Sequence, residues 1–532
     1  MKTDIRHGRA GHTLARTFSL TGLQILMILL FTFSPAVQAA PLVYVGNPST
    51  NELSVTDMAN FKTRVLFPLD GTGSIIANEA TGHVFINTTS GVSVIDEKKE
   101  KVVASIATAT PVHGLVVDKS GQRVLGISDP AMLRIIDPAN RKQVAALTLP
   151  GAPLGLVIDD EGERAYALTT ARVQVIDTTK GKLLKSIPVD PSANALALDP
   201  DGRKLYVTSS GSNGGIAGIT VINALAQRLD KVIPTATLAA DLPPNSLLIS
   251  PNGDKVLVFG GPSSAKSVRY LQFESATQQV RLVNVAITQS PQFIATPFDS
   301  NQLFGPDGKK FYIGGGSTGG ASVVAEIDTS SDTNSRVLVL PSNGAEYHYL
   351  TLLKSSVVDD RFVLVAFLFE HRIHTASEPH SVGFIDVSSG TILANVTFTQ
   401  GMFHSTLFGD VLDPCDHGKH STTAALILPS GSVALDQPLV LTARINGIDA
   451  TGRVVFRFWR DPTNGESPTM AKVSQTLTGG AAVLTQPGCN ADWPDALLKS
   501  ITCTGRFNVE VVYRGDVHNR KSVSQSKVSG RF

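Results

Sequence analysis

The sequence lacks an excess of charge of either sign. Its 532 residues include 46 Lys and Arg against 45 Asp and Glu, which gives a net charge of +1. Proteins that bind nucleic acid or an anionic membrane surface through charge usually carry a basic surplus. The balance therefore argues against nucleic acid as a partner.

A second long apolar run is also missing. The single one, Leu20–Phe33, follows a segment with four basic residues (2–16) and precedes the small residues of 36–40. This order is typical of a secretory signal peptide over residues 1–40, cleaved after Ala39 or Ala40. An uncleaved anchor helix is the alternative, although a span needs about 20 apolar residues. We expect an exported chain without a membrane span, located in the periplasm, on the cell surface or outside the cell.

Cysteines are scarce, with three in the whole chain and no Cys-x-x-Cys-His segment for haem attachment. Cys489 and Cys503 lie in one C-terminal segment and are candidates for a disulfide that closes a short loop, which suits an oxidising compartment. Cys415 is left over, and other pairings stay open. We identify no paired catalytic residues and no cofactor motif, so no catalytic residue is predicted.

A short phrase of apolar residues ending in an Asp or Asn recurs along the chain. It ends at Asp57, Asp96, Asp137, Asp177, Asn223, Asp328 and Asp386. The first three spacings are 39, 41 and 40 residues. A period of about 40 residues built from strands alone is typical of a β-propeller blade. We predict seven or eight blades over residues 41–412, and our count of hairpin units favours eight.

The unit is clearest at residues 194–223. Strands are expected at 194–198, 204–208 and 219–222, and the turn Asp199–Gly202 joins the first two because Pro200 presets φ and Gly202 accepts a positive φ. The strand at 42–45 has no inner strand before it. Residues 405–408 are expected to supply that strand, so that the two ends of the array complete one blade and hide both sheet edges.

Two segments carry a resemblance to a known family. Tyr44-Val45-Gly46-Asn47 with Leu53-Ser54-Val55-Thr56-Asp57, and Leu205-Tyr206-Val207-Thr208, resemble the YVTN β-propeller repeat, which occurs in surface-layer and other exported proteins. The chain departs from that repeat where Gly46 replaces the usual Thr and where 124–127 lacks the aromatic residue. The family usually has seven blades. The resemblance implies a fold and leaves the activity open.

After a polar linker at 413–421, the sequence changes character. Segments 439–445, 452–459 and 507–513 alternate apolar and polar residues, which predicts the half-buried strands of a sandwich. Thr451-Gly452-Arg453-Val454-Val455-Phe456, Tyr513-Arg514-Gly515-Asp516 and Ser522-Val523-Ser524 resemble bacterial immunoglobulin-like domains. The resemblance implies an immunoglobulin-like domain over 422–532, of a kind that acts as a spacer or adhesive module.

The repeat also predicts a candidate ligand site. The position eight residues before each turn glycine should lie at one mouth of the central channel. It holds Ser74, His113, Leu154, Asn194, Asn245 and Ser300, with His348 and His404 at similar places in two irregular units. Imidazole and amide groups in such a ring can bind a polar ligand, and His113, His348 and His404 can bind a metal. A hydrated polar rim that satisfies strand-end backbone groups is the alternative.

These observations favour an exported, non-catalytic binding or scaffold protein. The propeller would offer a binding face to a protein or glycan of the cell envelope, and the C-terminal domain would act as a spacer. A lactonase-like hydrolase acting at the channel mouth is the alternative, because propellers support many chemistries. The oligomeric state is left open.

Overall fold

The computed structural model describes residues 41–47, 50–71, 73–260, 267–287, 293–295, 302–305, 308–317, 322–339, 347–358, 361–370, 378–401, 408–412, 423–428, 437–446, 450, 453–460, 470–491, 496–503, 507–513 and 522–528. The predicted signal peptide (1–40) and the predicted linker (413–421) lie outside these ranges. Residues 40–532 belong to one compact unit. Within the described ranges, no helix is long and apolar enough to cross a membrane.

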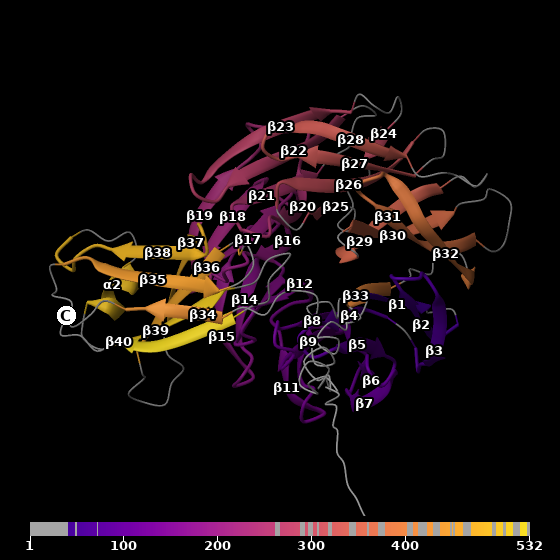
Figure 1. Cartoon of the computed structure of the whole chain (residues 1–532), viewed down its shortest axis with the longest axis horizontal. Helices are drawn as coiled ribbons and strands as arrows, with labels where there is room; N and C mark the ends of the chain where they lie inside the picture. Colours follow the sequence, from indigo (N-terminus) through magenta and orange to yellow (C-terminus); the bar gives the residue numbers. More distant parts are fainter. Residues whose placement is uncertain are drawn as a thin grey trace, which may run out of the picture. The chain divides into compact units, whose positions relative to one another are not determined.

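Strands between residues 42 and 412 form repeated antiparallel sheets (Figure 1). In pairing order, the first four sheets are β33 (Phe408–Leu412), β1 (Leu42–Asn47), β2 (Glu52–Asp57), β3 (Thr63–Pro68); β4 (Ile75–Asn78), β5 (His83–Thr88), β6 (Gly91–Asp96), β7 (Lys101–Ala107); β8 (His113–Val117), β9 (Val124–Ser128), β10 (Met132–Asp137), β11 (Lys142–Thr148); and β12 (Pro153–Ile158), β13 (Arg164–Thr169), β14 (Arg172–Asp177), β15 (Lys182–Pro188).

The next four sheets continue in the same order. They are β16 (Ala193–Leu198), β17 (Lys204–Ser209), β18 (Gly218–Asn223), β19 (Arg228–Pro234); β20 (Pro244–Ile249), β21 (Lys255–Gly260), β22 (Ser267–Glu274), β23 (Gln279–Ala286); β24 (Phe293–Ala295) with β25 (Gln302–Phe304), β26 (Lys310–Ser317), β27 (Ser322–Asp328), β28 (Thr333–Val339); and β29 (Tyr347–Val358), β30 (Arg361–Glu370), β31 (Glu378–Asp386), β32 (Thr391–Gly401). Repeated four-stranded antiparallel sheets of this kind form a β-propeller.

The burial of each strand follows its place in the sheet. In the fourth sheet, β13 and β14 are buried along nearly their whole length, whereas the outermost strand β15 is mostly exposed. Middle strands have a neighbouring sheet on each face, so both sets of alternating side chains are buried and most of them are apolar. The recurring apolar phrase of the sequence is this third strand.

Hydrophobic clusters join each sheet to the next and close the array. Leu133 of β10 packs with Ala167 of β13, and equivalent clusters link the other consecutive sheets in the described chain. The last sheet packs on the first, because Phe384 of β31 shares a cluster with Val43 and Val45 of β1. The innermost strands also contact one another in sequence, and β29 contacts β33, which in turn contacts β4.

The closing strand differs from the prediction in position. β33 pairs antiparallel with β1, with Leu412 opposite Leu42 and Phe408 opposite Gly46, and Figure 1 shows the two strands adjacent. The sequence predicted residues 405–408, of which 405–407 lie outside the described residues. The residues that pair with β1 are 408–412. This register depends on pairing between distant segments, so no local pattern in the sequence predicts it.

The turns between the first and second strands fix the spacing of the sheets. In the fourth sheet, Gly162 has φ +71°, and a Cβ at this position would lie 2.9 Å from the Cβ of Asp118 in the preceding turn. A glycine is therefore required both for the left-handed backbone and for the close approach of the neighbouring turn. The same approach to the preceding turn recurs at Gly121, Gly253 and Gly308, so consecutive turns stack along one end of the strands.

The C-terminal region is a β-sandwich with two sheets. One contains β34 (Thr423–Ile427), β35 (Leu439–Asn446) and β38 (Ala481–Gln486), and the other contains β37 (Met470–Thr476), β36 (Arg453–Trp459), β39 (Phe507–Tyr513) and β40 (Ser522–Val528). A single hydrophobic cluster draws on both sheets, including Leu441 and Phe456. The helix α2 (Ala496–Thr502) ends beside Cys503, which forms a disulfide with Cys489. Cys415 lies outside the described residues.

Candidate functional site

The ring predicted from the repeat coincides with a series of β-bulges in the innermost strands. In the fourth sheet Pro153 pairs with Thr169 and Gly155 with Leu168, which leaves Leu154 as the extra residue. Asn194, Asn245 and His348 are extra residues in the same sense in later sheets. A bulge leaves one residue without a ladder partner and redirects its side chain, so the repeated position has a structural cause that the spacing alone did not reveal.

The first two members of the ring differ in detail. His113 is the last paired residue before a bulge at the start of β8, and Ser74 immediately precedes β4. Ser300 and His404 lie outside the described residues, and for His348 only the backbone is described. We call the placed residues Ser74, His113, Leu154, Asn194 and Asn245 the bulge rim.

Three side chains of the bulge rim, Ser74, Asn194 and Asn245, form hydrogen bonds with a neighbouring sheet. The Asn194 Nδ2 donates to the Pro244 carbonyl oxygen at 2.8 Å and lies 3.4 Å from the Asn245 Oδ1. The Gly114 N–H, next to His113, donates to the Ser74 Oγ at 3.3 Å. The Thr208 hydroxyl also donates to the Asn194 Oδ1 at 2.8 Å, which fixes the amide. These bonds agree with the alternative in which rim side chains satisfy strand-end backbone groups.

Three members of the bulge rim are exposed to solvent. His113 and Asn245 are exposed, and Leu154 is 52% exposed. None of the described residues forms a group of three His, Cys, Asp or Glu side chains that could hold a metal ion. Of the three predicted metal ligands only the His113 side chain is described, so the metal site stays a prediction.

One short segment of the chain matches a catalytic sequence motif. Residues 315–319 spell Gly-x-Ser-x-Gly, the sequence of a nucleophile elbow. That elbow turns from a strand into a helix and exposes its serine at the turn. Here Ser317 ends β26 and the next element is another strand, β27. The motif at residues 315–319 therefore does not form a nucleophile elbow.

A second polar site, not predicted from the sequence, joins the sandwich to the propeller. Three consecutive turns contribute to it, and each does so through the residue just before the turn glycine. These residues are Glu161, Asp201 and Asn252, and they meet Arg453, Arg457, Lys472 and Ser474 from β36 and β37. We call this set the sandwich junction.

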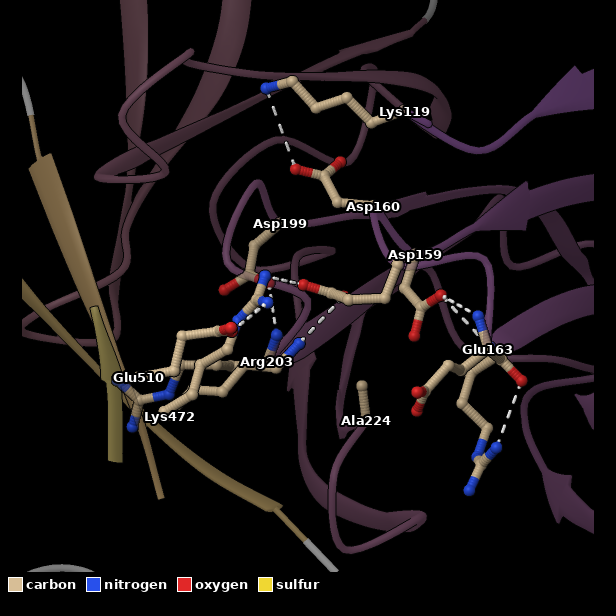
Figure 2. Close-up of polar contacts among 12 residues, drawn as sticks. Lys119, Asp159, Asp160, Glu163, Asp199, Arg203, Ala224, Lys472 and Glu510 are labelled. Carbon is tan, nitrogen blue, oxygen red and sulfur yellow. Dashed lines mark hydrogen bonds and ion pairs between the residues drawn. The ribbon is translucent and has the colours of Figure 1, made fainter. Parts of the chain in front are cut away.

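Glu161 is the centre of the sandwich junction. Its Oε1 accepts a hydrogen bond from Arg457 and its Oε2 lies 3.2 Å from the Lys472 Nζ. Arg457 also donates to the Glu510 Oε2 of β39 at 2.8 Å. Figure 2 shows Lys472 and Glu510 beside the turns that carry Asp159 and Asp199. Exposure of the Lys472 side chain is 6%, so its charge is nearly withdrawn from water.

The other two turns add contacts on the same side. The Ser474 hydroxyl bonds to the Asp201 carboxylate, and Arg453 lies 3.9 Å from that carboxylate. Arg453 also donates to the Asn252 carbonyl oxygen. A Cβ on Gly202 would lie 3.2 Å from the Lys472 Nζ, so the ammonium group occupies the space left by a turn glycine.

Two buried aspartates stabilise the turns through hydrogen bonds to the backbone. Asp159 and Asp199 each accept two backbone N–H groups of their own turn at Oδ1. Burial raises the pKa of both carboxyl groups, and the backbone hydrogen bonds and, for Asp159, the Lys472 charge offset part of that rise. Their repetition at the first turn position marks them as turn formers.

A sequence signal for the sandwich junction exists but is weak. The third turn residue is Glu161, Asp201 or Asn252 in the three docked turns, whereas the second and third sheets have Thr81 and Ser120 there. Because side chains alternate along a strand, Arg453 and Arg457 share the face of β36 opposite the core residues. Neither pattern by itself shows that the turn residues and the basic face of β36 meet.

Comparisons with known proteins add little beyond the fold. No family model matches the chain, and no curated protein matches it. Among solved structures, a dihydro-heme d1 dehydrogenase NirN in complex with DHE is similar at 15% identity over 71% of this chain and 76% of that chain, with a TM-score of 0.47. The Kuenenia stuttgartiensis hydrazine synthase aligns at 16% identity over 63% of this chain and 97% of its own, with a TM-score of 0.40.

A third similar structure is the β-propeller domain of Myceliophteria thermophila Cps50 (Swd1). It aligns at 11% identity over 63% of this chain and 99% of its own, with a TM-score of 0.39. All three TM-scores lie below 0.5, so no activity or partner of these proteins is transferred to this chain.

Proposed function

We propose that this chain is an exported, non-catalytic binding or scaffold protein of the cell envelope or surface. In this proposal each of the eight sheets is a blade of a YVTN-type propeller, and residues 422–532 form a bacterial immunoglobulin-like domain. The signal-like segment 1–40 and the two interaction-prone β folds support it. The partner is a protein or glycan of the envelope, bound at the bulge rim.

The observation that carries the proposal is the position of the two polar sites. Within β16, Asn194 of the bulge rim stands at the start of the strand, and Asp199 of the docked turn follows its end. Five residues of strand separate the two ends by about 16 Å. The contacts of the sandwich junction lie at the turn end, which leaves the bulge rim at the opposite end of the same strands.

The composition of the bulge rim fits a neutral partner surface. Its five placed side chains are Ser, His, Leu, Asn and Asn, with no carboxylate, Lys or Arg among them. Amide groups donate and accept hydrogen bonds at once, which suits hydroxyl groups of sugars and peptide backbones. The bonds from Asn194 and to Ser74 hold neighbouring strand ends in place and prepare the surface for binding.

The test compares a rim variant with a matched control. The rim variant carries His113→Ala, Leu154→Ala and Asn245→Ala, all exposed positions. The control carries Val144→Ala, Leu183→Ala and Gln279→Ala, which are exposed positions on the outermost strands of the same three sheets. Co-sedimentation of each purified chain with isolated envelope fragments is measured.

Retention reduced at least tenfold in the rim variant, with the control unchanged, is the expected result. Equal retention of the two variants would show that the rim is not the binding face. Lactone or ester turnover by the wild-type chain that disappears in the rim variant would replace the proposal with the hydrolase alternative. Sequencing the N-terminus of the exported chain tests the cleavage after Ala39 or Ala40.

A further inference from the structure

No hydrophobic cluster of the described residues is shared by the two sides of the sandwich junction. Within the described ranges, every hydrophobic cluster belongs either to the propeller or to the sandwich. Val455 and Val512 are buried on the strand face opposite the sandwich core, yet neither joins a cluster with a propeller residue. The hydrogen bonds described between the two parts are made by charged and polar groups, as in interfaces that form and separate reversibly.

The charges at the junction are complementary and unequally distributed. The sandwich presents Arg453, Arg457 and Lys472, with Glu510 as its own acid. The propeller presents Glu161 and Asp201 from adjacent turns. Lys472 has Glu161 as its described ion-pair partner, whereas Arg457 has both Glu161 and Glu510.

We propose that the sandwich is a reversible, charge-dependent dock on the propeller, and that Glu161 controls it. Three successive turns form the docking surface, and its occupant is the strand pair β36 and β37 of the same chain. Glu161 controls docking because it pairs with two nearly buried cations at once. Removing or reversing its charge removes one ion pair from each of two cations that are nearly withdrawn from water, which favours separation.

The charge of the turn residues also determines on which turns the sandwich docks. The equivalent residues of the second and third sheets are Thr81 and Ser120, which carry no charge to meet Lys472 or Arg457. Docking one or two sheets earlier would separate Lys472 and Arg457 from the Glu161 carboxylate, and such a mismatch disfavours the wrong register. The dock stands independently of any ligand at the bulge rim, because the two sites are at opposite strand ends.

A disulfide reporter measures docking directly. In a chain with Cys415→Ser, the substitutions Asp201→Cys and Ser474→Cys place thiols at two positions whose native side chains touch. The rate of intrachain cross-link formation under a mild oxidant then reports the docked fraction. The reporter uses the whole mature chain, and each single cysteine variant is the control for nonspecific oxidation.

Charge reversal tests the role of Glu161. Glu161→Lys is expected to slow cross-linking at least tenfold, and Lys472→Glu in the same chain is expected to restore much of the rate. Glu163→Lys is the matched control, because this exposed acid lies two residues further along the same turn and makes the same charge change. Unaltered circular dichroism of each variant confirms that the sheets are intact.

The ionic-strength series uses the reporter chain, in which Asp201 is already replaced by Cys, without a further charge substitution. Raising the NaCl concentration from 0.05 M to 0.5 M is expected to slow cross-linking in the reporter chain several-fold, because salt screens the attraction between separated charges. A Glu161→Lys chain that cross-links at the reporter's rate, or a rate that does not respond to salt, would overturn the proposal. Cross-links that form only between two chains would instead show that a second copy supplies the sandwich.

Discussion

Asp199 offers a test of how the repeated turns are stabilised. Its Oδ1 accepts the backbone N–H groups of Arg203 at 2.6 Å and Lys204 at 3.0 Å, and its side chain is buried. Replacing Asp199 by Ala leaves two donors without an acceptor at a site with little water. Each such donor costs about 1–3 kcal/mol, so Asp199→Ala should lower the free energy of unfolding by about 2–6 kcal/mol.

Asp199→Asn separates the hydrogen bonds from the charge. Because both bonds use one oxygen, the amide oxygen of Asn can accept both, and the loss should stay below about 1 kcal/mol. Burial raises the pKa of Asp199 above its ordinary 3.8. The stabilising contribution of its carboxyl group is therefore complete below pH 3.8 and declines as the pH rises through the raised pKa. Asp199→Asn should gain stability relative to the wild type across that interval.

Urea unfolding followed by far-ultraviolet circular dichroism measures both effects. Both tryptophans, Trp459 and Trp493, lie in the C-terminal region, so their fluorescence follows the sandwich separately. Equal losses in the Ala and Asn variants would refute the hydrogen-bond account. A relative stability of Asp199→Asn that decreases with rising pH would refute the electrostatic one.

Three other variants test separate features of the fold. Gly162→Ala should lose about 1–3 kcal/mol more than Gly214→Ala in urea unfolding, because both glycines have a positive φ but only the first has a neighbouring Cβ at 2.9 Å. Asp177→Asn should cost about 1 kcal/mol at pH 7. Although burial opposes it, the hydrogen bonds from Thr179 and Lys180 lower the pKa of Asp177, so its contribution is present above the ordinary 3.8 and the difference between the two chains should vanish as the pH falls through the lowered pKa. Replacing Cys489 and Cys503 by Ser should lower the unfolding free energy of the sandwich by about 3 kcal/mol, given their separation of 14 residues, and should shift the tryptophan transition while the propeller transition stays in place.

Local patterns in the sequence predicted the elements well. The phrases that end at Asp96, Asp137 and Asp177 are the third strands β6, β10 and β14, and the expected strand 507–513 is β39. Such strands can be predicted because the apolar pattern and the turn residues that define them occur within a few neighbouring positions of the sequence. The all-β propeller architecture follows from the same period of about 40 residues.

Features that depend on pairing between distant segments could not be predicted from the sequence. The bulges at Leu154, Asn194 and Asn245 arise because the second strand has one residue fewer than the first over the same length of ladder. The sandwich junction depends on Glu161 meeting Lys472, more than 300 residues later. No local rule relates such positions, and neither site could be assembled before the strands were placed.

The pairing of β1 with β33 has a consequence for how the chain acquires its structure. Residues 42–47 are among the first of the propeller to be made, yet their partner on one side begins only at Phe408. Through nearly the whole of synthesis, this early segment therefore stays unpaired along that edge and can pair with other strands. A factor that shields strand edges until the last repeat arrives would therefore act most strongly at the beginning of the array.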